Sequence, residues 1–156
     1  MRMAKFFLLF LSLCFISCAT FNPHMQSITS GDIRTFLKQA PRAEDHANAG
    51  VSVLFSYRYL EYFDNGTSVL RRAERIKIFN ERGRDFATQS ISYREGYNDV
   101  HLLYAHTITP DGKVIALNKK DIHDATAHVG YDFSTDIKAK RFTMPAVEDG
   151  CIIEFA

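Results

Sequence analysis

Cysteine is scarce in this sequence and tryptophan is absent: 156 residues contain three cysteines, two of them within the first eighteen positions. So few cysteines exclude a disulfide scaffold and a cysteine-rich zinc module. The chain also lacks an excess of either charge, with 19 basic and 18 acidic side chains. A general nucleic-acid-binding domain usually carries a strong basic excess, so we expect no nucleic-acid partner.

No apolar run is long enough to span a bilayer. The longest, Phe6–Ile16, is interrupted only by Ser12, and as a helix it would rise about 16 Å against a hydrocarbon core of about 30 Å. Arg2 and Lys5 precede this run, and small residues follow it, which is the pattern of a secretory signal peptide. The sequence therefore predicts a signal-peptide helix in residues 1–17 and secretion across the inner membrane.

Two processing sites fit the end of this segment. Ser17 and Ala19 would suit an ordinary cleavage site, whereas Phe15-Ile16-Ser17-Cys18 is similar to the lipobox of bacterial lipoproteins. We favour the lipobox, because the cysteine ends the apolar run where lipidation requires it. Cys18 is then the lipidation site, and more than one acyl chain would make the attachment stable. We expect a membrane-anchored lipoprotein in the periplasm, held at the outer membrane.

Hydrophobic periodicity divides the rest of the chain. Residues 18–48 are predicted to form the lipidated N-terminus, a tether and one short helix, which Ser30 or Asp32 would cap and Pro41 would end. From Val51 the apolar period becomes two, as in a β-strand with one buried face. We predict that residues 49–156 form a single domain of such strands.

The predicted strands are separated by turn signals such as Asp64-Asn65-Gly66 and Pro110-Asp111-Gly112. The first strand should bury its odd-numbered residues from Val51 to Tyr59, and the longest regular pattern should bury its even-numbered residues from Val100 to Ile108. The polar stretch Asn118–Ser134 is expected to be a loop. Short strands at this spacing predict an all-β fold, mainly an antiparallel β-sandwich or open barrel. The expected strands are Val51–Tyr59, Val69–Phe79, Phe86–Tyr93, Val100–Thr109, Val114–Leu117, Ile137–Met144 and Cys151–Phe155.

A family resemblance extends over residues 40–156. The segments Ala40–Asp45, Arg75–Gly83, Ala105–Ile115 and Phe142–Gly150, in this order, resemble the bacterial domain of unknown function found N-terminal to transglutaminase-like domains in envelope proteins. The resemblance implies an extracytoplasmic β-rich module. In such proteins the Cys-His-Asp domain follows the module, so we carry over no transglutaminase-like chemistry. We expect a domain truncated within its last strand, with an unpaired edge.

Candidate catalytic and metal-binding residues are few. Cys151 shares a strand face with Ile153 and Phe155, as a buried structural thiol would, and His106 is expected to be a core histidine. The alternative is that His106 activates Cys151 as a nucleophile. His123 and His128 are expected to be solvated loop residues, because they fit no zinc-ligand spacing. We expect no metal and no cofactor.

Two groups of side chains are candidates for partner binding. Arg71, Arg72 and Arg75 belong to a basic run that would suit an anionic partner, although such runs more often form a solvated strand face. Tyr57 and Tyr59 would suit a glycan, although alternation favours the core.

Our first hypothesis is a non-catalytic, membrane-anchored extracytoplasmic β-sandwich module that binds a protein or glycan partner. The alternatives are a small periplasmic cysteine-dependent hydrolase or acyl-transferase, and a fragment without function.

Overall fold

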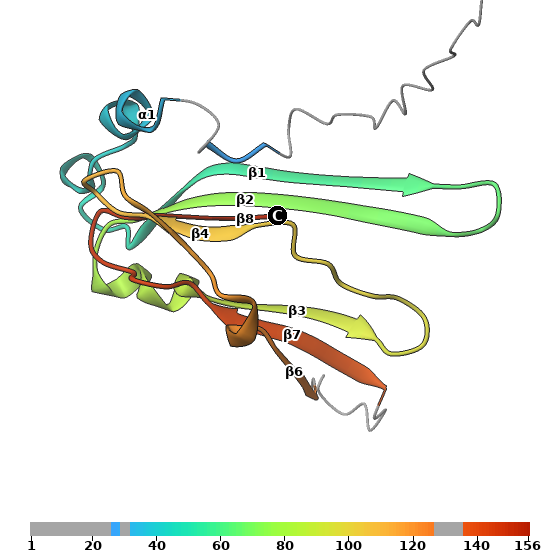
Figure 1. Cartoon of the computed structure of the whole chain (residues 1–156). Helices are drawn as coiled ribbons and strands as arrows, with labels where there is room; N and C mark the ends of the chain where they lie inside the picture. The colour runs from blue at the N-terminus through green and yellow to red at the C-terminus, as the bar shows by residue number, and fades with distance from the viewer. Residues whose placement is uncertain (1–25, 29–31, 127–135) are drawn as a thin grey trace, which may run out of the picture.

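The computed structural model describes residues 26–28, 32–126 and 136–156. Within these ranges the chain forms two antiparallel β-sheets, one above the other, with a short helix over the outer face of the larger sheet (Figure 1). The predicted all-β antiparallel architecture is confirmed. The expected signal-peptide helix in residues 1–17 and the lipidation site Cys18 lie outside the described residues.

The larger sheet contains five strands, and its order differs from the order along the chain. Its strands are, in spatial order, β1 (Val51–Tyr62), β2 (Ser68–Ile78), β8 (Ile152–Phe155), β4 (Ala105–Ile108) and β5 (Val114–Ala116). The last strand is therefore central. Phe155 pairs with Glu74 on one side and with Ala105 on the other, so the expectation that β8 would present unpaired edges is wrong.

The smaller sheet has the order β3 (Thr88–Arg94), β7 (Ile137–Thr143), β6 (His123–Thr126). Strand β6 lies in the stretch predicted to be a loop. It was missed because it is an exposed edge strand without apolar alternation. The third strand begins at Thr88 and not at Phe86, because a 3-10 helix over Glu81–Ala87, capped by Asn80, includes the preceding residues. Further 3-10 helices span Ala43–His46 and Lys119–Asp121.

The helix α1 (Ile33–Gln39) begins at Asp32, whose carboxylate accepts hydrogen bonds from the backbone N–H groups of Arg34 and Thr35. It ends before Pro41, as predicted. Its apolar residues Ile33, Phe36 and Leu37 pack against the larger sheet. Within the described part of the chain, no helix is long and apolar enough to cross a membrane.

Both faces of the larger sheet are covered at its centre. Cys151, Ile153 and Phe155 pack into the core between the two sheets, and Ile152 packs on the opposite face beside Ile108. Consequently β4 is buried on both faces. The prediction of a one-sided strand over Val100–Thr109 is therefore wrong. Only Ala105–Ile108 form a strand, and all four residues are buried.

The predicted alternation in β1 is also interrupted. The register with β2 shifts between Val53 and Phe55, which makes Leu54 a bulge residue. One extra residue shifts the alternation of the residues that follow it. Phe55, Tyr57 and Tyr59 therefore lie opposite Arg75, Ala73 and Arg71 and not on the face of Ile76. Leu54 packs under α1, whereas Val53 and Tyr59 are exposed and not in the core. In β2, Ile76 and Ile78 are buried in the core between the two sheets.

Candidate functional site

The hairpin of β1 and β2 extends beyond the rest of its sheet (Figure 1). Its two strands pair from Val51–Ile78 to Tyr62–Ser68, whereas β8 covers β2 only from Lys77 to Glu74. At the tip, the N–H of Gly66 donates to the carbonyl of Phe63 and Gly66 has a φ of +80°, as the predicted turn requires. Large apolar side chains near this tip are exposed, among them Tyr62, Phe63 and Val69.

One face of the hairpin carries a row of aromatic rings with arginines beside them. The rings of Phe55, Tyr57 and Tyr59 follow one another at centroid distances of 6.3 and 6.5 Å and are nearly parallel. Arg71 is directly opposite Tyr59, and its guanidinium carbon lies 5.9 Å from the ring centroid. Arg71 also pairs with Glu61 at 2.5 Å. The fold thus brings together three of the residues selected from the sequence: Tyr57, Tyr59 and Arg71.

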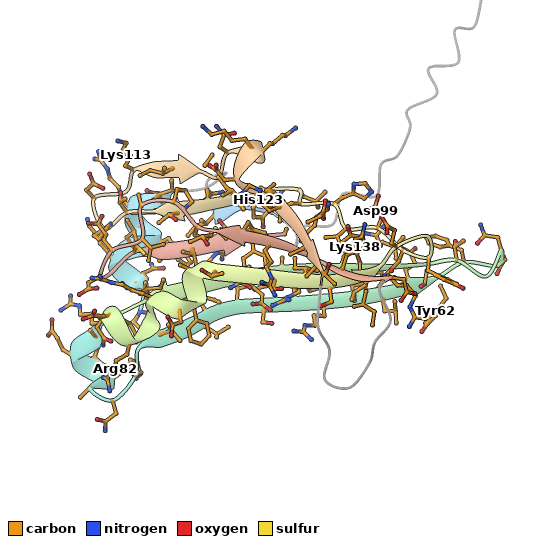
Figure 2. The ribbon with its side chains drawn as sticks, turned by 90° about the horizontal axis from the view of Figure 1, so that it is seen from below. Tyr62, Arg82, Asp99, Lys113, His123 and Lys138 are labelled. Atoms are coloured by element: carbon orange, nitrogen blue, oxygen red, sulfur yellow. The ribbon has the colours of Figure 1, made fainter. Side chains whose placement is uncertain are left out.

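The opposite face of the hairpin exposes apolar side chains. Leu60 and Leu70 are paired across the two strands and are 48% and 63% exposed, and Tyr62 is 76% exposed. Figure 2 shows Tyr62 toward the free end of the hairpin, far from Lys113 and Arg82 at the other end of the molecule. We call Leu60, Tyr62 and Leu70 the hairpin patch. Sequence reasoning missed it, although large apolar residues close to a turn were a usable signal.

The rim of the hairpin patch is charged. Arg72 contacts Glu74 at 2.6 Å, and Arg58 lies 3.8 Å from the same carboxylate. The guanidinium carbon of Arg72 is 5.4 Å from the centroid of the Phe155 ring. Arg72 therefore lies where the covered part of the sheet meets the exposed hairpin.

Arg75, the remaining arginine selected from the sequence, is directed elsewhere. Its Nη2 and Nε lie 2.5 and 3.1 Å from Oε1 of Glu154, a side chain that is 1% exposed. The aromatic rings of Phe36 and Phe55 flank the guanidinium. Because its charge is neutralised inside the protein, we do not include Arg75 in the proposed binding surface.

Glu154 is the centre of a buried polar cluster on the α1 side of the sheet. Oε2 lies 3.0 Å from Nε2 of His106, and both carboxylate oxygens accept the backbone N–H of Ile28, at 3.0 and 3.1 Å. Burial raises the pKa of the Glu154 carboxyl, but the hydrogen bonds from His106 and Arg75 outweigh burial and hold the pKa below its ordinary value. The carboxylate is thus ionised and binds the N-terminal segment to the sheet. A glutamate within an apolar strand was the signal in the sequence.

This cluster contains a serine, a histidine and a carboxylate, but it lacks the geometry of a catalytic triad. Ser27 Oγ lies 3.2 Å from Nε2 of His106, and the Glu154 carboxylate approaches the same nitrogen. In a triad the nucleophile and the carboxylate bind the two different ring nitrogens, so that the histidine can receive a proton while held in place. The arrangement therefore supports a structural role.

The structure does not bring Cys151 and His106 together. Cys151 is fully buried in the core between the sheets. His106 pairs with Glu154 in register and so lies on the other face of the same sheet. Burial raises the pKa of the Cys151 thiol, which is the opposite of what a nucleophile needs.

Among the described residues, no group of three or more histidine, cysteine, aspartate or glutamate side chains could hold a metal ion. His123 is exposed, but it lies on β6 and not in the expected loop. Its neighbour Asp124 binds Lys140 and the hydroxyl of Tyr93. His128 lies outside the described residues.

Comparison with known proteins gives one family and one fold. The model of a family described as a Domain of Unknown Function with solved-structure structure (DUF3857) matches residues 64–156. The crystal structure of a putative protease from Parabacteroides distasonis is similar at a TM-score of 0.64 and 12% sequence identity, over 68% of this chain. The chain spans 22% of that protein's length, and a similarity at this identity concerns the fold alone. No curated protein matches the sequence.

Proposed function

We propose that this chain, which belongs to the DUF3857 family, is a non-catalytic binding module that holds a protein partner on its β1–β2 hairpin. The observation that carries this proposal is the exposure of Leu60, Tyr62 and Leu70 on the part of the hairpin that extends beyond the pairing with β8. Contiguous apolar side chains with arginines around them are typical of protein interfaces.

A protein partner suits this surface better than a glycan does. Sugars bind aromatic side chains by stacking on an open ring face, whereas Arg71 already lies over the Tyr59 ring. Leu60 and Leu70 offer apolar area without a ring face. Burying such area is favourable by about 25 cal/mol per Å². An apolar protein surface would bury this area on binding, whereas a polar sugar would not.

We further propose that Cys18 is lipidated and that the module is attached to the outer membrane from the periplasmic side. The support is the charged start, the apolar run Phe6–Ile16 and the lipobox-like sequence that ends in Cys18. One solved structure of similar fold is that of a putative protease, of which this chain spans 22%. That relation supports an accessory role for the fold beside a larger enzyme, as the resemblance to modules preceding transglutaminase-like domains also implies.

The anchoring proposal has a matched control within the signal segment. Cys18→Ala should move the protein from the membrane fraction to the soluble periplasmic fraction and make its processing insensitive to globomycin. Cys14→Ala should leave both properties unchanged. Membrane attachment that survives Cys18→Ala would show that the lipid is not the anchor.

The binding proposal is tested by photo-crosslinking in intact cells. Benzoylphenylalanine at position 62, on the hairpin patch, should give a discrete adduct. The same probe at position 86, on the 3-10 helix Glu81–Ala87, should give none. Leu60→Asp together with Leu70→Asp should abolish the adduct at position 62. An adduct that persists in this variant, or equal adducts at both positions, would contradict the proposal.

A further inference from the structure

We propose that Asn65, at the tip of the β1–β2 hairpin, is a site of spontaneous chemical modification, where the side-chain amide is lost and aspartate or isoaspartate remains. The backbone nitrogen of Gly66 is the nucleophile, and water is the co-reactant. The inference concerns the chemistry of the turn and does not depend on the partner proposed above.

The tip of the hairpin is a tight turn that is open to solvent (Figure 1). The N–H of Phe63 donates to the carbonyl of Thr67, and the N–H of Gly66 donates to the carbonyl of Phe63, both at 2.9 Å. Residues 62–70 are all exposed. Within the described part of the chain, and apart from its two neighbours, no atom lies within 4 Å of the place that a Cβ on Gly66 would occupy. Nothing packed on the turn there opposes the backbone rotation that brings the Gly66 nitrogen onto the Asn65 side chain.

The reaction replaces one bond to the side-chain carbon of Asn65 with another. The Gly66 nitrogen gives its proton to a solvent base and forms a bond to Cγ of Asn65, which closes a cyclic imide. The bond from Cγ to the side-chain nitrogen breaks, and ammonia leaves with a proton returned from solvent. Water then adds to either ring carbonyl and breaks the bond from that carbon to the nitrogen. One opening gives aspartate, the other gives isoaspartate, and nothing is oxidised or reduced.

Thr67 supplies two hydrogen-bond donors that favour this attack. Its backbone N–H and its hydroxyl both donate to Oδ1 of Asn65, at 3.1 and 2.7 Å. Negative charge develops on this oxygen when the Gly66 nitrogen attacks Cγ. Two donors at such distances from a developing oxyanion have the arrangement of an oxyanion hole. The turn therefore polarises the amide that it holds beside the nucleophile.

Two other asparagines share part of this arrangement and serve as internal controls. Oδ1 of Asn80 accepts the N–H of Arg82, and Oδ1 of Asn118 accepts the N–H of Lys120, each at 3.1 Å. Each of these asparagines is followed by a residue with a side chain, which crowds the backbone nitrogen, whereas glycine leaves its nitrogen accessible. In the whole sequence, Asn65 is the one asparagine that precedes a glycine.

Two aspartates also precede a glycine with a positive φ, but their charge protects them. Asp111 precedes Gly112 with a φ of +88°, and Asp149 precedes Gly150 with a φ of +85°. A carboxylate resists attack by nitrogen because it already carries a negative charge. The hydrogen bond from the Thr109 hydroxyl holds the pKa of Asp111 below its ordinary value, and Asp149 belongs to an exposed ion pair. The neutral amide of Asn65 has no such protection.

Conversion changes both the charge and the backbone of the tip. Each product adds a carboxylate next to Asp64. Isoaspartate also carries the main chain through the side-chain carbons, which lengthens it by a methylene group. The two hydrogen bonds that close the turn then cannot both keep their geometry. We expect the N–H of Phe63, which donates to Thr67 in this turn, to exchange with solvent faster in the isoaspartyl form.

The test is incubation of the full chain, kept in detergent, in mildly alkaline buffer, followed by trypsin digestion and mass spectrometry against an unincubated sample. The peptide Tyr59–Arg71 contains Asn65 and no other asparagine. It should acquire the mass shift of amide hydrolysis at least tenfold faster than the peptides that contain Asn80 and Asn118. Electron-transfer fragmentation should identify isoaspartate as well as aspartate at position 65, because water opens either side of the imide.

Substitutions in the turn test the role of each group. Thr67→Val removes the hydroxyl but keeps the backbone N–H and the branched side chain, and should slow the conversion at least threefold. Thr67→Ser keeps the hydroxyl and should convert at nearly the rate of the unaltered protein. Asn65→Gln should abolish the mass shift, because a longer side chain would have to close a larger ring.

Four outcomes would contradict the inference. An unmodified Tyr59–Arg71 peptide, or conversion at Asn80 or Asn118 as fast as at Asn65, would overturn it outright. Aspartate without isoaspartate would mean direct hydrolysis without attack by the Gly66 nitrogen. Equal rates in Thr67→Val and in the unaltered protein would show that the hydroxyl does not assist. None of these outcomes affects the crosslink at position 62, which tests the proposed function separately.

Discussion

Arg75 and Glu154 lie 79 positions apart and form an ion pair at 2.5 Å beneath the helix α1. The carboxylate also holds His106 and the backbone of Ile28. The Glu154 carboxylate of β8 therefore connects β2 and β4 to the N-terminal segment at Ile28.

Replacing this carboxylate should destabilise the domain. Glu154→Gln leaves the Arg75 guanidinium without its counter-charge in a buried site, and breaking such a pair typically costs about 3–5 kcal/mol. Urea unfolding followed by circular dichroism measures the loss. Arg84→Ala, which removes an exposed pair with Asp149, is the control and should change stability little. Equal effects would show that Glu154 is not a structural centre.

Stability should also depend on pH through Glu154. The pKa of this carboxyl is below its ordinary value of 4.5 in the folded protein, so the unfolded chain binds the proton more readily. Its contribution is present above pH 4.5 and is lost as the pH falls through the folded pKa. The free energy of unfolding at about pH 3.5 should therefore be lower than at pH 6. Exposed aspartates contribute equally in the unaltered protein and in Glu154→Gln. The free energy of unfolding should therefore depend less on pH in the variant. An unchanged dependence would assign it to other groups.

Cys151 should react slowly with thiol reagents in the folded protein. Its sulfur is buried, and burial raises its pKa, so both access and thiolate content are low. In a background with Cys14→Ala and Cys18→Ala, we expect labelling at least about a hundredfold slower in buffer than in urea, because it requires opening of the core. Rapid labelling of the folded chain at neutral pH would revive the cysteine-enzyme alternative.

The hairpin patch should be nearly neutral for stability, although it is apolar. Leu70→Ser alters an exposed side chain and should change the free energy of unfolding by about 0.5 kcal/mol or less. Ile153→Ala, in the core between the sheets, should cost about 2–5 kcal/mol. A single cooperative transition in both variants would exclude the alternative that the chain is an unstable fragment. A large loss from Leu70→Ser would mean that the patch is part of the core.

Local sequence patterns predicted the parts of the fold that depend on neighbouring residues. Period-two alternation located most strands, and the sequence Pro110-Asp111-Gly112 predicted a turn in which Gly112 indeed has a φ of +88°. The side chain of Cys151 was placed in the core because Ile153 and Phe155 share its face. These inferences needed only the geometry of a single strand or turn.

The remaining features depend on long-range contacts or on small local exceptions. The bulge at Leu54 is one extra residue, and the spacing of apolar residues does not predict it. Strand β6 pairs with β7 through its backbone while its side chains stay exposed. The Arg75–Glu154 pair and the hairpin patch both follow from the central place of β8, which no local pattern predicts.

The central place of β8 has a consequence for how the domain is assembled. The larger sheet cannot close until residues 152–155 are available, since they join β2 to β4. Before then the hairpin and the β4–β5 pair are two separate pieces with exposed apolar edges. Contacts between residues so distant in sequence slow folding and lengthen exposure to aggregation. During synthesis the unfinished sheet would therefore stay open to aggregation until residues 152–155 have joined its two pieces.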